Sequence, residues 1–139
     1  FEAALDKDGI AYKEYAIADT NEVQSVTTAA AGECDVLYIP TDNTLASVTE
    51  TVYNVVAPAK IPVIAGEEGI CNGCGVATLS ISYYDLGYAT GEMAYEILAE
   101  GADTTTMDVR YAPNVTKKYN AKICEELGIT VPDDYVAIQ

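Results

Sequence analysis

The residues of this chain that are best suited to bind a ligand follow directly after a short apolar run. Val36-Leu37-Tyr38-Ile39-Pro40 is followed by Thr41-Asp42-Asn43-Thr44, so hydroxyl, carboxylate and amide groups begin where the apolar residues stop. If the run is a parallel strand covered on both faces, these side chains lie at its carboxyl end and open the next helix. Open α/β sheets bind small ligands at that edge. The same residue types are common helix N-caps, so capping is the alternative interpretation of Asp42 and Asn43, and also of Ser82 farther along the chain.

Two further segments place polar groups after an apolar run. Gly66-Glu67-Glu68 follows residues 61–65, and Ser82-Tyr83-Tyr84-Asp85 follows residues 76–81. In a parallel sheet built of strand-helix units, every loop from a strand to a helix emerges at the same edge. We therefore expect the three polar segments to converge in space.

Together these side chains can hold a small zwitterion or polyol. Hydroxyls and helix N-termini suit carboxylate or phosphate oxygens, and Asp42 or Glu68 can hold an ammonium group. Tyr83 or Tyr84 can supply an aromatic wall, and because neighbours in an extended segment face opposite ways, one of the two is expected to pack inward. For Glu67 and Glu68 a solvated turn is the simpler interpretation. The predicted ligand-binding set is Thr41, Asp42, Asn43, Thr44, Glu68, Ser82 and Tyr84.

Hydrophobic periodicity alternates between short apolar runs and longer helical stretches, which is typical of βαβ units. It predicts an α/β fold with an open parallel sheet flanked by helices. The expected strands cover residues 11–17, 36–39, 61–65 and 76–81, with an edge strand at 108–111. The expected helices cover residues 1–8, about 20–32, 43–56 (ended by Pro58), 82–100 and 120–127. In the longest of these helices Leu86, Ala89, Met93, Ile97 and Leu98 are expected to face a core, with Gly87 and Gly91 allowing close approach to a sheet.

Length and charge limit the function classes. Half of the 139 residues are hydrophobic, which is enough for a single domain with a real core. The 22 acidic residues outnumber the 7 basic ones, there is no histidine, and the formal net charge is -15. Phosphate binding needs clustered Lys and Arg, so nucleic acid and anionic membrane surfaces are not expected partners.

No secretory signal and no bilayer-spanning apolar run stand in the sequence, so no direct membrane insertion is expected. Because the chain starts at Phe1 in what reads as the middle of a helix, we expect a fragment whose targeting signal lies upstream.

The Cys71-Asn72-Gly73-Cys74 segment invites a metal or redox interpretation. A zinc site without histidine would also need Cys34 and Cys124, which are not expected to meet. A thioredoxin-type CxxC opens a helix after a strand, whereas Gly75 and a predicted strand follow this one. We interpret the segment as a tight turn, open to a disulfide in an exported protein, and predict no metal and no cofactor.

An enzymatic function has little support in the sequence. Without histidine, a G-x-S-x-G elbow or a phosphate-binding glycine loop, only a carboxylate or tyrosine mechanism is left. Nothing pairs such groups, so we predict no catalytic residue.

Four blocks, in order, carry a resemblance to a known family: residues 35–44, 61–69, 83–91 and 127–132. In these blocks the chain resembles the solute-binding proteins of ABC importers, in particular a bacterial group linked to aromatic amino acids such as tryptophan and tyrosine. The resemblance implies a periplasmic-binding-protein-like fold of type I, in which two Rossmann-like lobes trap a solute between them. This chain would be the second lobe, and the N-terminal lobe of the same protein would be missing.

The same resemblance implies that Thr41, Asp42 and Asn43 contact the solute, with help from the loop around Glu68 and the turn at residues 82–84. Many relatives carry Asp where this chain has Ser82, which leaves the identity of the solute open. The implied partners are a small-molecule solute, most of all an amino acid, and an ABC permease. The implied location is extracytoplasmic, either periplasmic or lipid-anchored at the cell surface. The alternative function is the effector-sensing domain of a transcription regulator with this architecture.

Overall fold

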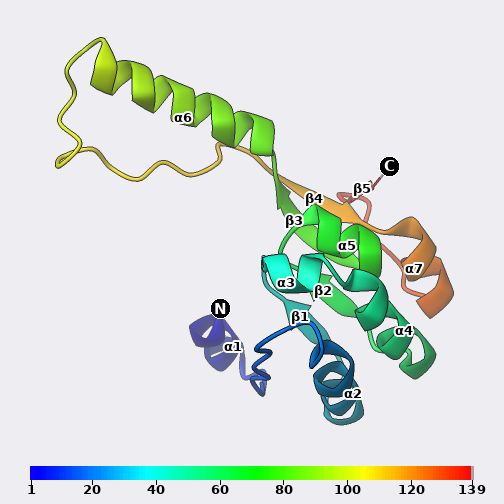
Figure 1. Ribbon diagram of the computed structural model, residues 1–139. Helices are drawn as coiled ribbons and strands as arrows, with labels where there is room; N and C mark the ends of the chain where they lie inside the picture. The colour runs from blue at the N-terminus through cyan, green and yellow to red at the C-terminus, as the bar shows by residue number, and fades with distance from the viewer. Residues whose placement is uncertain (139) are drawn as a thin grey trace.

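The computed structural model describes residues 1–138, which form an α/β fold around one five-stranded sheet (Figure 1). The strands lie in the order β1 (Leu37–Ile39), β2 (Val63–Ala65), β3 (Ala77–Ile81), β4 (Val115–Tyr119) and β5 (Val136–Ala137). β1, β2 and β3 are parallel, whereas β4 runs antiparallel to β3 and parallel to β5. The helices are α1 (Glu2–Asp8), α2 (Val23–Glu33), α3 (Asn43–Ala46), α4 (Thr49–Ala59), α5 (Glu68–Cys74), α6 (Tyr83–Leu98) and α7 (Ala121–Leu127). The predicted α/β class, an open parallel sheet flanked by helices, is confirmed, although β4 makes the sheet mostly parallel and not wholly so.

The main core lies between one face of the sheet and helices α4 and α5. Val52 and Val56 are four residues apart, so they share one face of α4, and both are buried. They pack in one cluster with Val63 of β2 and Ile70 of α5. A second, smaller cluster of Val76, Ile123 and Cys124 fixes α7 beside the sheet.

The expectation that the strands are covered on both faces is wrong. Tyr38, Ile64 and Leu79 share the opposite face and are 42%, 38% and 58% exposed. On that face α1 lies near β1, because the ring of Phe1 stacks on Tyr38 with centroids 4.1 Å apart. The helix-covered face therefore carries most of the packing energy.

Two predicted strands do not form in the described chain. Residues 11–17 join no ladder, and of this segment Ile17 packs against the core while Tyr12 is exposed. Residues 108–111 run beside α6, where Arg110 pairs with Glu96 at 2.6 Å. The sheet is instead extended by β4 and β5, which the hydrophobic pattern did not mark because β4 is largely polar.

Two helices differ from their predicted bounds. The stretch expected as one helix from residue 43 to 56 is divided into α3 and α4, and the Ser47 hydroxyl donates to the Thr44 carbonyl at 2.7 Å in the last turn of α3. α4 continues through Pro58 and ends where Lys60 adopts a left-handed conformation with φ of 57°. α2 includes Gly32.

The Cys-Asn-Gly-Cys segment expected as a tight turn is the end of helix α5. The Glu67 carboxylate caps this helix by accepting from the backbone N–H groups of Gly69, at 2.8 Å, and Ile70. A Cβ at Gly73 would lie 2.2 Å from the Thr49 hydroxyl, so glycine lets α5 pack closely against the start of α4. Capping and close packing outweigh the low helix propensity of two glycines.

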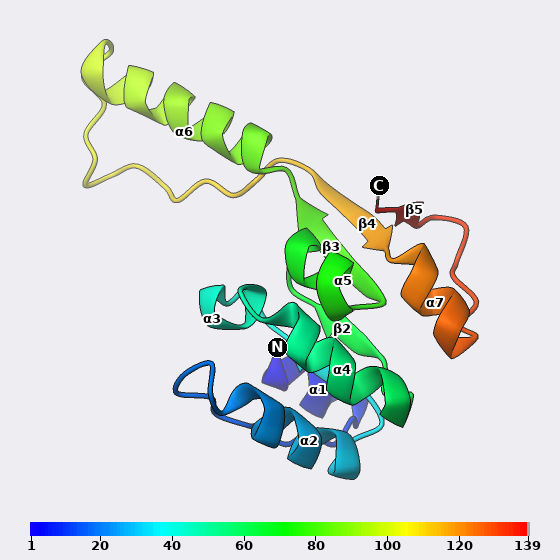
Figure 2. The same ribbon diagram turned by 45° about the vertical axis from the view of Figure 1, so that its right-hand side comes forward.

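Helix α6 and the segment that returns from it extend away from the sheet as an arm, here defined as residues 83–114 (Figures 1 and 2). The arm is held together by Asn114 donating to Asp85 at 3.3 Å and by the pair between Arg110 and Glu96. No residue of α6 is buried, so the expected core face does not form among residues 1–138, and Leu98, expected on that face, is 86% exposed. A Cβ at Gly87 or Gly91 would meet nothing within 4 Å. The expected approach of these glycines to a sheet does not occur within this chain.

Candidate ligand-binding site

The three polar segments leave the same end of the sheet, as the sequence predicts. Because β1, β2 and β3 are parallel, the segments that follow them emerge at one end of the sheet. In the register Ile39 lies opposite Ala65, so residues 41–44 and 66–68 begin side by side. We call residues 41–44, 66–68 and 80–84 the carboxyl edge.

Close backbone approach joins the first two segments of the carboxyl edge. The Gly66 N–H donates to the Ile39 carbonyl at 2.7 Å, and the Thr41 hydroxyl donates to the Gly66 carbonyl at 3.3 Å. A Cβ at Gly66 would lie 2.6 Å from the Thr41 nitrogen and 2.9 Å from the Pro40 carbonyl carbon. Only glycine fits there, because backbone atoms cannot rotate out of the way as a side chain can.

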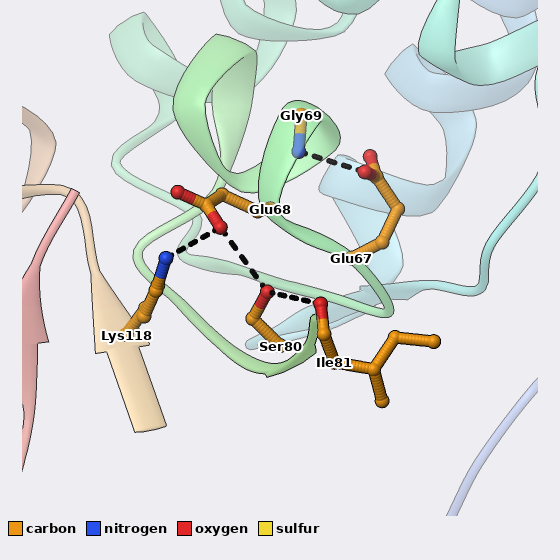
Figure 3. Close-up of polar contacts among 6 residues, drawn as sticks. All are labelled: Glu67, Glu68, Gly69, Ser80, Ile81 and Lys118. Atoms are coloured by element: carbon orange, nitrogen blue, oxygen red, sulfur yellow. Dashed lines mark hydrogen bonds and ion pairs between the residues drawn. The ribbon is translucent and has the colours of Figure 1, made fainter. Parts of the chain in front are cut away.

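A polar network joins the second segment to strands β3 and β4 (Figure 3). The Ser80 hydroxyl of β3 donates to Glu68 Oε2 at 3.2 Å, and Lys118 Nζ of β4 donates to the same oxygen at 2.6 Å. The hydrogen bond and charge of Lys118 lower the pKa of Glu68, although partial burial opposes the shift. Glu68 therefore lies in an ion pair and not in a solvated turn.

Sequence reasoning missed Lys118 as a member of this network. Lys118 is 50 residues from Glu68 in the chain and lies in a strand that the hydrophobic pattern did not predict. The one available signal is two adjacent lysines, at positions 117 and 118, in a chain with only 7 basic residues.

The capping interpretation of two candidate residues is confirmed. Asp42 Oδ1 accepts from the Leu45 N–H at 2.8 Å, and the Ser82 hydroxyl accepts from the Asp85 N–H at 3.1 Å. Each cap uses one acceptor oxygen, so the second carboxylate oxygen of Asp42 has no hydrogen-bond partner within residues 1–138. Capping thus fixes the position of Asp42 without consuming its binding capacity.

The remaining candidates differ in exposure. Asn43 and Thr41 are exposed at the start of α3, and Thr44 is half-buried. Tyr83 and Tyr84 are 62% and 81% exposed, so the expectation that one of them packs inward is wrong. Both belong to the first turn of α6, on an arm that leaves the sheet, and not to an extended segment. Thr41, Asp42 and Glu68 lie at the same end of the sheet. Tyr84 lies at the start of the arm, in the first turn of α6.

The cysteines lie inside the core. Cys71, Cys74 and Cys124 are buried free thiols, and Cys34 is a half-buried free thiol. Burial raises the pKa of Cys71 and of Cys74 to about 12. Among residues 1–138 no group of three or more Cys, Asp or Glu side chains is arranged to hold a metal ion. The cysteines act as small apolar side chains in the packing of α5 and α7.

We expect Cys71 and Cys74 to react with a thiol reagent at pH 8 about 1,000-fold more slowly in the folded protein than in guanidinium chloride. With a pKa of about 12 little thiolate is present, and both sulfurs are shielded. The absorbance of the released thiol chromophore reports the rates, and Cys34→Ser removes the more accessible thiol as a control. A mass two hydrogens below that of the reduced chain would instead indicate a disulfide and contradict this prediction.

Comparison with known proteins agrees with this geometry. The family model described as ABC transporter substrate binding protein matches residues 1–138. A curated "Tyrosine-binding protein" from Clostridioides difficile (strain R20291) is 41% identical over 85 residues, which are 61% of this chain and 25% of that protein. Within residues 1–138, no helix combines the length and hydropathy that a membrane crossing requires.

Three solved structures share the fold. A ligand-free, open substrate binding protein with adhesive properties from Clostridium difficile is 35% identical with a TM-score of 0.74, over 99% of this chain and 48% of that one. An ABC domain in complex with L-Trp from Streptococcus pneumonia is 33% identical with a TM-score of 0.83, over 96% of this chain and 45% of that one. A conserved domain protein from Vibrio cholerae is 30% identical with a TM-score of 0.85, over 99% of this chain and 48% of that one.

The chain spans a quarter of the curated relative and a little under half of each solved structure. The family match extends over all the described residues, and the matching structures are of substrate-binding proteins where their function is stated. The chain belongs to the ABC transporter substrate binding protein family.

Proposed function

We propose that this chain is one lobe of a two-lobe protein that binds an amino acid, aromatic ones included, between its lobes and delivers it to an ABC permease. The observation that carries the proposal is the carboxyl edge, where three strand ends are tied together by the contacts of Gly66 and Glu68. The names of two relatives, one called tyrosine-binding and one solved with L-Trp, support an aromatic solute.

The chemistry of the carboxyl edge suits an amino acid. The hydroxyls of Thr44 and Ser82 can donate to the solute carboxylate, whereas the Thr41 hydroxyl, whose hydrogen points to the Gly66 carbonyl, can accept from the solute. Asp42, through its free oxygen, and Glu68 can accept from the ammonium group. The Asn43 amide can bind either the carboxylate or the ammonium group of the solute, and Tyr84 can contact an aromatic side chain of the solute.

The exposed face of α6 favours the proposal that a second lobe packs against this chain. Tyr84, Tyr88, Gly91, Tyr95 and Leu98 recur at alternating spacings of four and three, so they form one stripe along the helix. The stripe lies opposite the half-buried side that carries Met93, and Leu98 is 86% exposed. A shallow, open depression lies on this side of the helix, lined by Tyr88, Gly91, Glu92, Tyr95, Glu96 and Glu100.

A stripe of large apolar groups along a whole helix is the kind of surface that another domain covers. We infer that the other lobe covers it and that the arm carries the connection between the lobes. The solute would then bind between the carboxyl edge and the facing lobe, outside the cytoplasm, where a permease collects it. In this arrangement the chain serves binding and transport and has no catalytic role.

The proposal predicts that the complete two-lobe protein binds an aromatic L-amino acid more tightly than other members of an amino-acid panel in titration calorimetry. Asp42→Asn is expected to weaken this binding by about tenfold and to leave stability nearly unchanged. The reason is that Asn caps a helix as well as Asp but lacks the charge that attracts an ammonium group.

The matched control is Asp103→Asn. Asp103 Oδ1 accepts from the Thr105 N–H at 2.9 Å in the return segment, so the same chemical change occurs away from the carboxyl edge. Its affinity is expected to equal that of the wild type. Failure of every amino acid to bind would refute the proposed solute class, and unchanged affinity of Asp42→Asn would remove Asp42 from the site.

A further inference from the structure

The Glu68 carboxylate is held by one oxygen only. Lys118 Nζ and the Ser80 hydroxyl both bind Oε2, at 2.6 Å and 3.2 Å. Oε1 has no hydrogen-bond partner among residues 1–138, and Figure 3 shows it turned away from both donors. The side chain is therefore fixed in orientation and keeps one free acceptor.

Lys118 differs from the other ion-paired basic residues of the described chain. Its side chain is 28% exposed, less than in any other ion pair found there. Its partner network includes Ser80, which is buried. Exposed pairs of flexible side chains contribute little, whereas a half-buried pair anchored by a buried hydroxyl holds a defined geometry.

The adjacent lysine has no such role. Successive side chains of a strand alternate between the two faces of the sheet, so Lys117 and Lys118 lie on opposite faces. Lys118 lies opposite Thr78 in the ladder, on the face that α5 covers. Lys117 pairs with Asp134 at 2.5 Å and is 48% exposed. Two chemically identical neighbours thus stand in different environments.

We propose that Lys118 is a positioning residue that, together with Ser80, holds Glu68 so that Oε1 is presented to the ammonium group of the solute. The proposal rests on the proposed function, since it assumes that an amino acid binds at the carboxyl edge. In this proposal Lys118 does not contact the solute. It sets the orientation and the charge state of Glu68, which does.

A pH-dependent consequence follows from the charges around Glu68. Lys118 approaches from β4, Ser80 from β3 contributes a neutral hydroxyl, and Glu67 and Cys71 are the titratable neighbours on its own segment. Lys118 lowers the pKa of Glu68, so the carboxylate stays ionised until the pH falls well into the acid range. Without Lys118 the pKa rises, and an acceptor for the solute ammonium is lost at a higher pH.

The experiment compares the wild type with Lys118→Met, Lys118→Arg and Lys117→Met in the complete protein. Calorimetry with the tightest-binding amino acid from pH 4 to pH 8 gives affinity against pH, and NMR of ¹³C-labelled glutamate carboxyls gives the Glu68 titration without solute. For Lys118→Met we expect about tenfold weaker binding at pH 7. We also expect the loss of affinity on acidification to begin at a higher pH than in the wild type. Lys118→Arg is expected to rescue most of the affinity, and Lys117→Met to match the wild type.

The outcomes are distinguishable. An unchanged Glu68 titration in Lys118→Met overturns the proposal, whatever the solute. A raised Glu68 pKa without any change in the affinity profile also overturns it, because the pair would then be structural only. If the wild type itself binds no amino acid, the proposed function fails and this inference falls with it, and that result is visible before any substitution is made.

Discussion

Replacing Gly66 with alanine is expected to lower the free energy of unfolding by about 3 kcal/mol and to weaken solute binding by about tenfold or more. The added Cβ would lie 2.6 Å from the Thr41 nitrogen and 2.9 Å from the Pro40 carbonyl carbon. Both atoms belong to the backbone, so the loop after β1 must move. That loop carries Asp42 and its neighbours, so stability and affinity should fall together. Denaturant unfolding and titration calorimetry on the complete protein measure the two effects.

Gly32→Ala is the matched control for this substitution. Gly32 lies within α2, and a Cβ there would meet nothing within 4 Å. The same chemical change should be neutral or stabilise the protein by up to about 1 kcal/mol, because alanine is the better helix former. Equal unfolding midpoints for Gly66→Ala and the wild type would contradict the close approach of the two loops.

The second large effect is expected at the exposed stripe of α6. In the complete two-lobe protein, Tyr88→Ser should lower the free energy of unfolding by about 3 kcal/mol, because a tyrosine buried between lobes would be replaced by a small polar group. For a protein of that size, this change lowers the melting temperature by about 5 to 10 °C. Within this chain alone Tyr88 is 63% exposed, so nothing in its own surroundings accounts for such a loss.

Tyr12→Ser serves as the control. Tyr12 is also an exposed tyrosine, but it lies on the segment between α1 and α2 and not on the stripe. Its substitution should change the free energy of unfolding by no more than about 0.5 kcal/mol. Melting curves that coincide for Tyr88→Ser and Tyr12→Ser would show that no second lobe covers α6.

Features encoded over a few neighbouring residues could be predicted from the sequence. β1, β2 and β3 follow from short apolar runs, and α1 and α7 end at Gly9 and Gly128, which adopt the left-handed conformation. Asp42 and Ser82 cap their helices as their residue types suggest. The emergence of three polar segments at one end of the sheet also follows, because parallel strands place the loops that follow them at the same end.

Features that depend on distant partners could not be predicted. β4 was missed because a polar strand is stabilised by its pairing with β3 and by the partners of its lysines, which no local pattern shows. The tight turn predicted around Cys71 is part of a helix, since packing of Gly73 on Thr49 and the Glu67 cap favour α5. Periodicity placed Leu86, Ala89 and Met93 on a core face of α6, but these residues are only half-buried, and the exposed tyrosine stripe on the opposite side was not predicted.

The fold class, the family and the edge of the sheet where polar groups gather could be inferred from the sequence alone, because these depend on local periodicity and on blocks of adjacent residues. The orientation of Glu68 depends on tertiary contacts, since Lys118 is 50 residues away in the chain and reaches Glu68 from a strand that joins the sheet after the arm. The outward orientation of Tyr88 and its neighbours also depends on the tertiary structure. Contacts between distant residues depend on the packing of the whole chain, so they cannot be predicted from any single segment.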